Sequence, residues 1–156
     1  MEMIDVSGFG TLAVSIVTVR KTGQSYTCKE EQASLNVQND ILSDIAFVKL
    51  DKGYYLEGNA CDFSISSQTK SPVGFLWELK GRDMEHAVEQ LDIALKRLKT
   101  DGVGIQYREA SIVASGAQKI PTAKWQKLQQ KFFKANKVRL NRYSNNGKAL
   151  FSKMIA

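Results

Sequence analysis

The sequence is poor in cysteine, proline and histidine. Its 156 residues include two cysteines, two prolines and one histidine. Cys28 and Cys61 are too few for a disulfide framework and form no CxxC metal motif, so we expect two reduced thiols. The single histidine excludes a site built from several histidines, and a Ser-His-Asp triad unless His86 serves it. We expect His86 on the surface rather than as a ligand.

Long hydrophobic runs are also missing, and we expect no leader peptide. The longest apolar stretch, residues 12–19, contains Ser and Thr and is too short to cross a bilayer. The segment Met1–Asp5 has neither the basic start nor the small-residue cleavage site of a signal peptide. We therefore expect a single domain over residues 1–156, located in the cytoplasm and without a membrane partner.

Acidic residues are absent from the last 47 residues. Residues 1–109 hold 12 Lys or Arg and 16 Asp or Glu, whereas residues 110–156 hold 10 Lys or Arg and no acid. The net charge of +6 therefore conceals an acidic part with −4 and a basic part with +10. A basic segment of this kind indicates a surface for a polyanion, and a solubilising face is the alternative.

Periodicity and turn residues divide the chain into strands and helices. Hydrophobic alternation predicts strands, and apolar spacing of three and four residues predicts helices. We expect strands over 11–20, 45–50, 54–57, 62–66, 73–80, 105–114 and 137–143, helices over 29–43, 83–99 and 121–135, and a short closing segment over 149–155. This order favours an α/β (α+β) fold with a central mixed β-sheet flanked by helices.

Three charged residues stand out on two of the apolar strands. Asp62 opens one strand, and Glu78 and Lys80 lie two residues apart at the end of the next, so both point to one face. If the strands pair as a hairpin, Asp62 reaches the other two. Two carboxylates and an ammonium can hold a divalent metal ion and activate water. Taken singly, Asp62 suits a turn, and Glu78 with Lys80 suits an ion pair.

Asp62, the Glu78-Leu79-Lys80 strand end and the following helix with Gln90 resemble the PD-(D/E)XK restriction-endonuclease-like superfamily. The segment 75–91 is also similar to small bacterial proteins with an ELKG core. The resemblance covers residues 60–94 and implies a restriction-endonuclease-like fold. The motif's proline is replaced by Cys61.

The resemblance also implies roles for single residues. Asp62, Glu78 and the Leu79 carbonyl would bind Mg²⁺, with Mn²⁺ as the alternative ion. Lys80 would serve the attacking water, and Gln90 would assist from the helix. A further acid from an N-terminal helix would be Glu30 or Glu31.

Basic residues form a stripe on the second predicted helix. Lysines there repeat one residue before the apolar positions Trp125, Leu128 and Phe132, about 100° around the helix. Lysines one turn apart suit contacts with phosphates that do not read sequence. The candidate nucleic-acid contacts are Arg108, Lys119, Lys124, Lys127, Lys131, Lys134, Arg139 and Arg142. A solvated lysine face is the alternative interpretation.

Together these features predict a metal-dependent endonuclease that hydrolyses phosphodiester bonds in nucleic acid, with DNA favoured over RNA. The partner would be nucleic acid, and the chain could act as a homodimer or as a subunit of a larger complex. The rival hypothesis is a non-catalytic nucleic-acid- or protein-binding subunit on the same fold, for example in phage (antiviral) defence or counter-defence.

Overall fold

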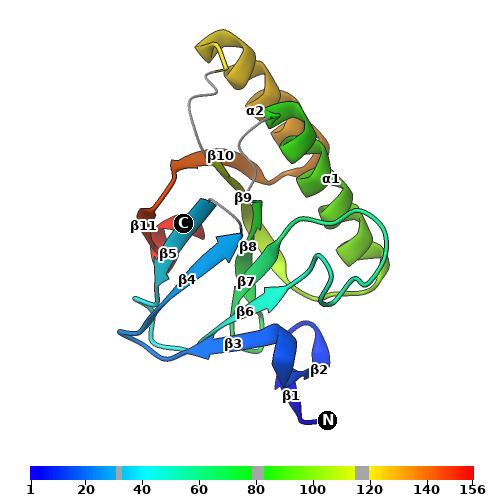
Figure 1. The fold of residues 1–156 in the computed structure, drawn as a ribbon, viewed down its shortest axis with the longest axis vertical. Helices are drawn as coiled ribbons and strands as arrows, with labels where there is room; N and C mark the ends of the chain where they lie inside the picture. Colours follow the sequence, from blue (N-terminus) through cyan, green and yellow to red (C-terminus); the bar gives the residue numbers. More distant parts are fainter. Residues whose placement is uncertain (31–32, 79–82, 115–119) are drawn as a thin grey trace.

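A computed structural model describes residues 1–30, 33–78, 83–114 and 120–156 of the chain. These residues form a six-stranded mixed sheet, a three-stranded sheet, a two-stranded hairpin and three α-helices (Figure 1). The elements are β1 (Met3–Val6), β2 (Gly10–Ala13), the 3-10 helix η1 (Val14–Ile16), β3 (Val17–Arg20), β4 (Ser25–Glu30), β5 (Ala33–Gln38), β6 (Ile45–Lys49), β7 (Phe63–Ser67), β8 (Val73–Glu78), α1 (Met84–Thr100), β9 (Gln106–Ala114), α2 (Thr122–Asn136), β10 (Arg139–Ser144), β11 (Gly147–Leu150) and α3 (Phe151–Met154).

The main sheet has the strand order β10-β9-β8-β7-β6-β3. Strands β6, β7 and β8 form an antiparallel meander, β9 and β10 continue it in parallel, and β3 closes the other edge. Helix α1 connects β8 to β9 and α2 connects β9 to β10, and both helices lie beside the same part of the sheet (Figure 1). The predicted mixed sheet flanked by helices is therefore confirmed.

The sheet separates two hydrophobic cores. Leu76 and Ala110 face α1 and pack with its buried residues, which include Leu91. Phe75 and Trp77 face the other way and pack with β5 and α3 of the smaller sheet layer. Because both faces of β8 are buried, its sequence is a continuous apolar run rather than an alternating one.

Helix α1 follows the sequence pattern closely. Its buried residues recur at the spacing of one helical face and include Met84, Ala87 and Leu98. Asp83 is the N-cap, and its side chain accepts a hydrogen bond of 3.1 Å from the His86 backbone N–H. The chain leaves the helix through Gly102, which has a φ of +77°.

The helix predicted over residues 29–43 is wrong. Residues 25–30 and 33–38 form β4 and β5, which pair with each other in antiparallel fashion. The apolar residues Ala33, Leu35 and Val37 alternate into the second core, so their period is two. Burial on that face, together with the poor helix formers Ser34 and Asn36, outweighs the weak helical pattern.

Two other predictions need correction. Residues 54–57 form no strand. The Tyr54 and Tyr55 N–H groups donate to the carbonyls of Lys49 and Leu50 in a tight turn, and the Leu50 N–H donates to the Asp62 carbonyl instead. The strand predicted over residues 11–20 is interrupted by η1, so β2 pairs with β1 and β3 with β6. The remaining predicted strands and helices are present within a few residues of their expected ends.

Candidate functional site

Glu78 occupies the carboxyl end of β8, near the middle of the main sheet. Glu78 is 2% exposed. It lies on the same face of β8 as Leu76, and this face packs against α1. Its register partner on β9 is Ile112, which also belongs to the helix-side core. Burying a carboxylate is costly unless hydrogen bonds or a cation compensate its charge, so Glu78 is a candidate site residue rather than an ordinary core residue.

Asp62 lies immediately before β7, between the ends of β6 and β8. Its N–H donates to the Trp77 carbonyl at 3.1 Å, and its carbonyl accepts from the Leu50 N–H at 2.9 Å. The Asp62 side chain is 6% exposed. Burial raises the pKa of the Cys61 thiol well above its ordinary value, and the carboxylates of Glu78 and Asp62 raise it further. The structure thus brings both predicted acids to the same end of the sheet.

A small cavity opens beside Glu78. It has a volume of about 90 Å³ and is lined by Asp51, Gly58, Asn59, Ala60, Glu78 and Gln90. Gln90 is 8% exposed on α1, and its Nε2 lies 3.1 Å from Nε2 of the exposed His86. The structure therefore places Gln90 near the end of β8, on the helix from which the resemblance implies that it would assist. Asp62 does not line this cavity.

Asp51 is an acid at the cavity that the sequence patterns did not reveal. With Lys52 and Gly53 it predicts only the turn of a hairpin, and Lys52 does adopt a left-handed φ of 59°. Asp51 nevertheless lines the cavity with Glu78, because the chain after β6 runs alongside Cys61. One signal in the sequence could have indicated Asp51 as a site residue: it is an acid directly after the mostly buried residues 45–50, on the segment that leads to Asp62.

The loop that forms one wall of the cavity is anchored to α1 by Arg97. The Arg97 guanidinium donates to the carbonyls of Asn59 at 2.8 Å and Glu57 at 3.2 Å. It also lies 3.8 Å from the centroid of the Tyr55 ring, and the Tyr55 hydroxyl donates to Asp101 at 2.6 Å. These contacts fix residues 57–59 relative to α1 and so fix part of the cavity wall.

The donor atoms around the cavity are oxygens of the kind that Mg²⁺ prefers. Asp51 and Glu78 supply carboxylates, and Gln90 supplies an amide. Magnesium keeps several water ligands and needs only one or two carboxylates, and the cavity has room for several waters. No group of three or more His, Cys, Asp or Glu arranged for a metal occurs in the described parts of the chain. The donor set therefore fits a hydrated Mg²⁺ held by few protein ligands.

Other predicted site residues are placed elsewhere or are not described. Glu30 lies on strand β4 rather than on a helix, and its carboxylate is 3.9 Å from Lys49 Nζ, so the expected acid from an N-terminal helix is wrong for Glu30. Glu31, Leu79, Lys80 and Lys119 lie outside the described residues.

The predicted basic residues fall into different surroundings. Lys127, Lys131 and Lys134 are exposed on α2, whereas Lys124 forms an ion pair of 2.5 Å with Glu85 of α1. The three arginines of the predicted basic surface lie in three different environments. Arg142 lies over the Trp125 ring at 5.0 Å, Arg139 donates to the Met154 carbonyl at 3.1 Å, and Arg108 is exposed near the start of β9.

Arg108 does not reach the cavity. Glu78 is in register with Ile112, four residues further along β9, so Arg108 is about 13 Å away along the strand.

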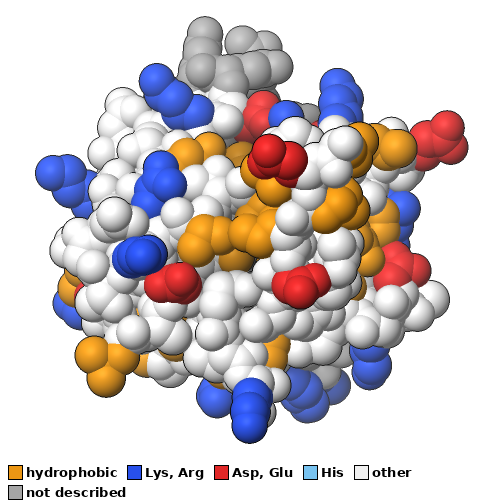
Figure 2. All heavy atoms as spheres, turned by 90° about the horizontal axis from the view of Figure 1, so that it is seen from below, with side chains coloured by type: hydrophobic (Ala, Val, Ile, Leu, Met, Phe, Trp, Pro, Cys, Tyr) orange, Lys and Arg blue, Asp and Glu red, His pale blue; other side chains and the backbone are white. Residues whose placement is uncertain are grey.

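The face seen from the end of the β1–β2 hairpin has hydrophobic side chains at its centre and basic ones mostly around its edge (Figure 2). The exposed Lys127, Lys131 and Lys134 of α2 form no ion pair with another described residue and so are the best remaining part of the predicted basic surface.

Comparison with protein-family models, with curated proteins and with solved structures gave no match. The resemblance to PD-(D/E)XK nucleases consequently stays a hypothesis based on the motif. Among the described residues, no helix is both long and apolar enough to span a membrane.

Proposed function

We propose that the chain is a Mg²⁺-dependent nuclease that hydrolyses phosphodiester bonds in nucleic acid, with DNA as its preferred substrate. The observation that carries the proposal is the buried Glu78 at the end of a central strand, beside Asp62 and facing an oxygen-lined cavity with Gln90. In the Asp…Glu-x-Lys motif the Asp would lie close to the Glu, and the backbone contact of Asp62 with Trp77, the residue before Glu78, supports this part of the proposal.

Each residue has a role that its position permits. Glu78 and Asp51 would contribute carboxylate oxygens to the ion, and Asp62 would add charge from the neighbouring strand end. Gln90 would orient a water or phosphate oxygen, and Lys80 follows two residues after Glu78 in sequence. A bound Mg²⁺ would neutralise charge on the phosphate and lower the pKa of a bound water.

The substrate backbone would be held by the basic residues of the C-terminal part. Lys127, Lys131 and Lys134 are exposed on one helix and repeat about once per turn. Point charges at this spacing bind phosphates without selecting a base sequence. The proposal therefore includes salt-sensitive binding with little sequence preference.

One observation favours the rival function, a non-catalytic nucleic-acid- or protein-binding subunit. The described residues contain no cluster of three or more metal-ligating side chains, and Asp62 does not line the cavity. A degenerate site that binds nucleic acid without cutting it would look similar.

A cleavage assay separates the two functions. The chain is incubated with supercoiled DNA, linear DNA, single-stranded DNA and RNA, in Mg²⁺, Mn²⁺ or EDTA. The proposed nuclease cuts at least one DNA substrate in Mg²⁺ and none in EDTA. Glu78→Gln and Asp62→Asn should abolish cleavage and retain DNA binding, whereas Glu89→Gln, an exposed acid on α1, should cut normally. Binding without cleavage by the unaltered chain would establish the rival function.

A further inference from the structure

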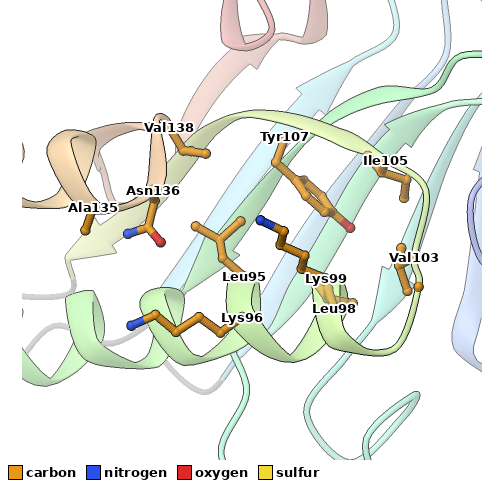
Figure 3. A pocket seen from close by; sticks show the side chains of 11 residues that line it. Leu95, Lys96, Leu98, Lys99, Val103, Ile105, Tyr107, Ala135, Asn136 and Val138 are labelled. Carbon is orange, nitrogen blue, oxygen red and sulfur yellow. The ribbon is translucent and has the colours of Figure 1, made fainter.

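A second and larger cavity lies at the opposite end of α1 from Gln90. It has a volume of about 620 Å³, which is within the usual range for small-molecule sites. Its lining comes from the last turns of α1 and α2 and the beginning of β9 (Figure 3). The apolar part of the lining consists of Leu95, Leu98, Val103, Ile105, Ala135 and Val138, together with the ring of Tyr107.

The cavity exists because small residues lie at the ends of the two helices, where larger side chains would fill the space between them. The α2 side offers Ala135, and the α1 end offers Gly102. Near the start of both helices the gap is closed by the Lys124–Glu85 ion pair. At the cavity, Asn136 at the end of α2 donates a hydrogen bond of 2.9 Å from its Nδ2 to Asp92 in the middle of α1. Leu95 and Val103 remain only partly buried, so apolar surface is left for a ligand to cover.

The charge at this cavity is positive and concentrated on one side chain. The Asp92 carboxylate is paired with Lys96 Nζ at 2.7 Å and also accepts a hydrogen bond from Asn136. Lys99 has no carboxylate within 4.0 Å among the described residues, and its ammonium points into the cavity between Leu95 and Tyr107 (Figure 3). Burial raises the pKa of Tyr107, so its ring contributes no charge, and its hydroxyl already shares a hydrogen bond of 2.7 Å with Ser64.

We infer that this cavity binds a small amphipathic carboxylate, with its apolar body against Leu98, Ile105 and Val138 and its anionic group on Lys99. An aliphatic chain suits the lining better than a nucleobase, because five of the eleven lining residues are branched aliphatic and only one is aromatic. A single ammonium suits one carboxylate. Binding here is independent of the proposed nuclease activity, since it uses different residues at the other end of α1.

Calorimetric titration with decanoate, below its micelle concentration, tests the inference. Unaltered protein should bind one decanoate per chain, and decanol should bind at least about tenfold more weakly, since a charge-assisted hydrogen bond contributes about 1.5–3 kcal/mol. Lys99→Gln should lower the affinity for decanoate by the same factor. Lys148→Gln removes an exposed lysine on β11 and should bind decanoate normally.

A cavity-filling variant provides the second test. Ala135→Phe places a ring in the opening of the cavity and should prevent decanoate binding without lowering the melting temperature, because Ala135 is exposed on its helix. The inference is overturned if unaltered protein does not bind decanoate, or if Ala135→Phe binds it as well as unaltered protein. Equal affinity for decanol, or binding of adenosine monophosphate in place of decanoate, would overturn it as well.

Discussion

At the scale of single residues, the position of Glu78 is the most informative feature of the molecule. Glu78 is 2% exposed at the end of an otherwise apolar strand, where a carboxylate needs compensation from hydrogen bonds, a cation or a bound ligand. The sequence could predict that Glu78 and Gln90 lie near each other and that Asp62 precedes the neighbouring strand, because their spacing on two strands and a helix is local. It could not identify Asp51, whose approach to Glu78 depends on the path of the loop after β6.

Asp40 provides a pH-dependent prediction at the residue scale. Its carboxylate accepts hydrogen bonds from the Ser152 N–H, at 2.8 Å, and from the Ser152 hydroxyl. Slight burial tends to raise its pKa, but these hydrogen bonds prevail and lower it below the ordinary value. Its contribution to stability is therefore fully present above the unfolded pKa of about 3.9 and is lost as the pH falls through the lower folded pKa.

The variant Asp40→Asn should therefore be less stable than the unaltered protein near pH 7. The difference should disappear in strongly acidic solution, where Asp40 is protonated in both states. Thermal unfolding followed by circular dichroism over this pH range measures it. A difference between the two proteins that stayed constant with pH would exclude the carboxylate as the cause.

At the scale of elements, the sequence predicted strongly periodic segments well and context-dependent ones poorly. Helix α1 was predictable because its apolar face, its Asp83 cap and its terminal Gly102 all agree. Strands β4 and β5 were not, because the burial of Leu35 and Val37 requires the second sheet layer, which is formed with β11 from the far end of the chain. The resemblance to PD-(D/E)XK nucleases covers only residues 60–94, so it could not predict this second layer.

The link between α1 and the cavity wall leads to a second prediction. Arg97→Lys keeps the charge but removes the planar guanidinium group. That group donates hydrogen bonds to two carbonyls and lies over the Tyr55 ring. We expect the free energy of unfolding to fall by about 1–2 kcal/mol. We also expect Mg²⁺-dependent cleavage to decrease, because residues 57–59 would no longer hold the wall in place.

Two measurements separate these effects. Chemical denaturation gives the stability, and cleavage rates over a range of Mg²⁺ concentrations show whether the variant needs more metal. Lys99→Gln, which changes a neighbouring charge on α1 outside the cavity near Glu78, is the control. An unchanged metal requirement in Arg97→Lys would show that the loop does not shape the site.

At the scale of the whole molecule, charge separates the two parts of the chain. The ten basic residues after residue 109 have no acid among them in sequence, yet folding gives some of them partners from the first part, such as Glu85 for Lys124. Sequence therefore predicted the basic character of α2 but overestimated the number of cations that remain available for a polyanion.

Replacing Lys127, Lys131 and Lys134 together by Gln should weaken DNA binding and make it less sensitive to salt. If each lysine neutralises one phosphate of a duplex, the slope of log K against log salt should decrease in magnitude by about 0.9 for each lysine replaced. Fluorescence anisotropy with a labelled duplex at several salt concentrations measures this slope. Lys148→Gln serves as the control, and an unaltered slope in the triple variant would place the DNA elsewhere.

The central claim is that Glu78 belongs to a divalent-cation site, and titration calorimetry with Mn²⁺ tests it most directly. Unaltered protein and Glu89→Gln should each bind one ion per chain with equal affinity. Glu78→Gln, which keeps the shape of the side chain and removes its charge, should bind at least about tenfold more weakly. Equal Mn²⁺ affinity in Glu78→Gln and unaltered protein would contradict the claim.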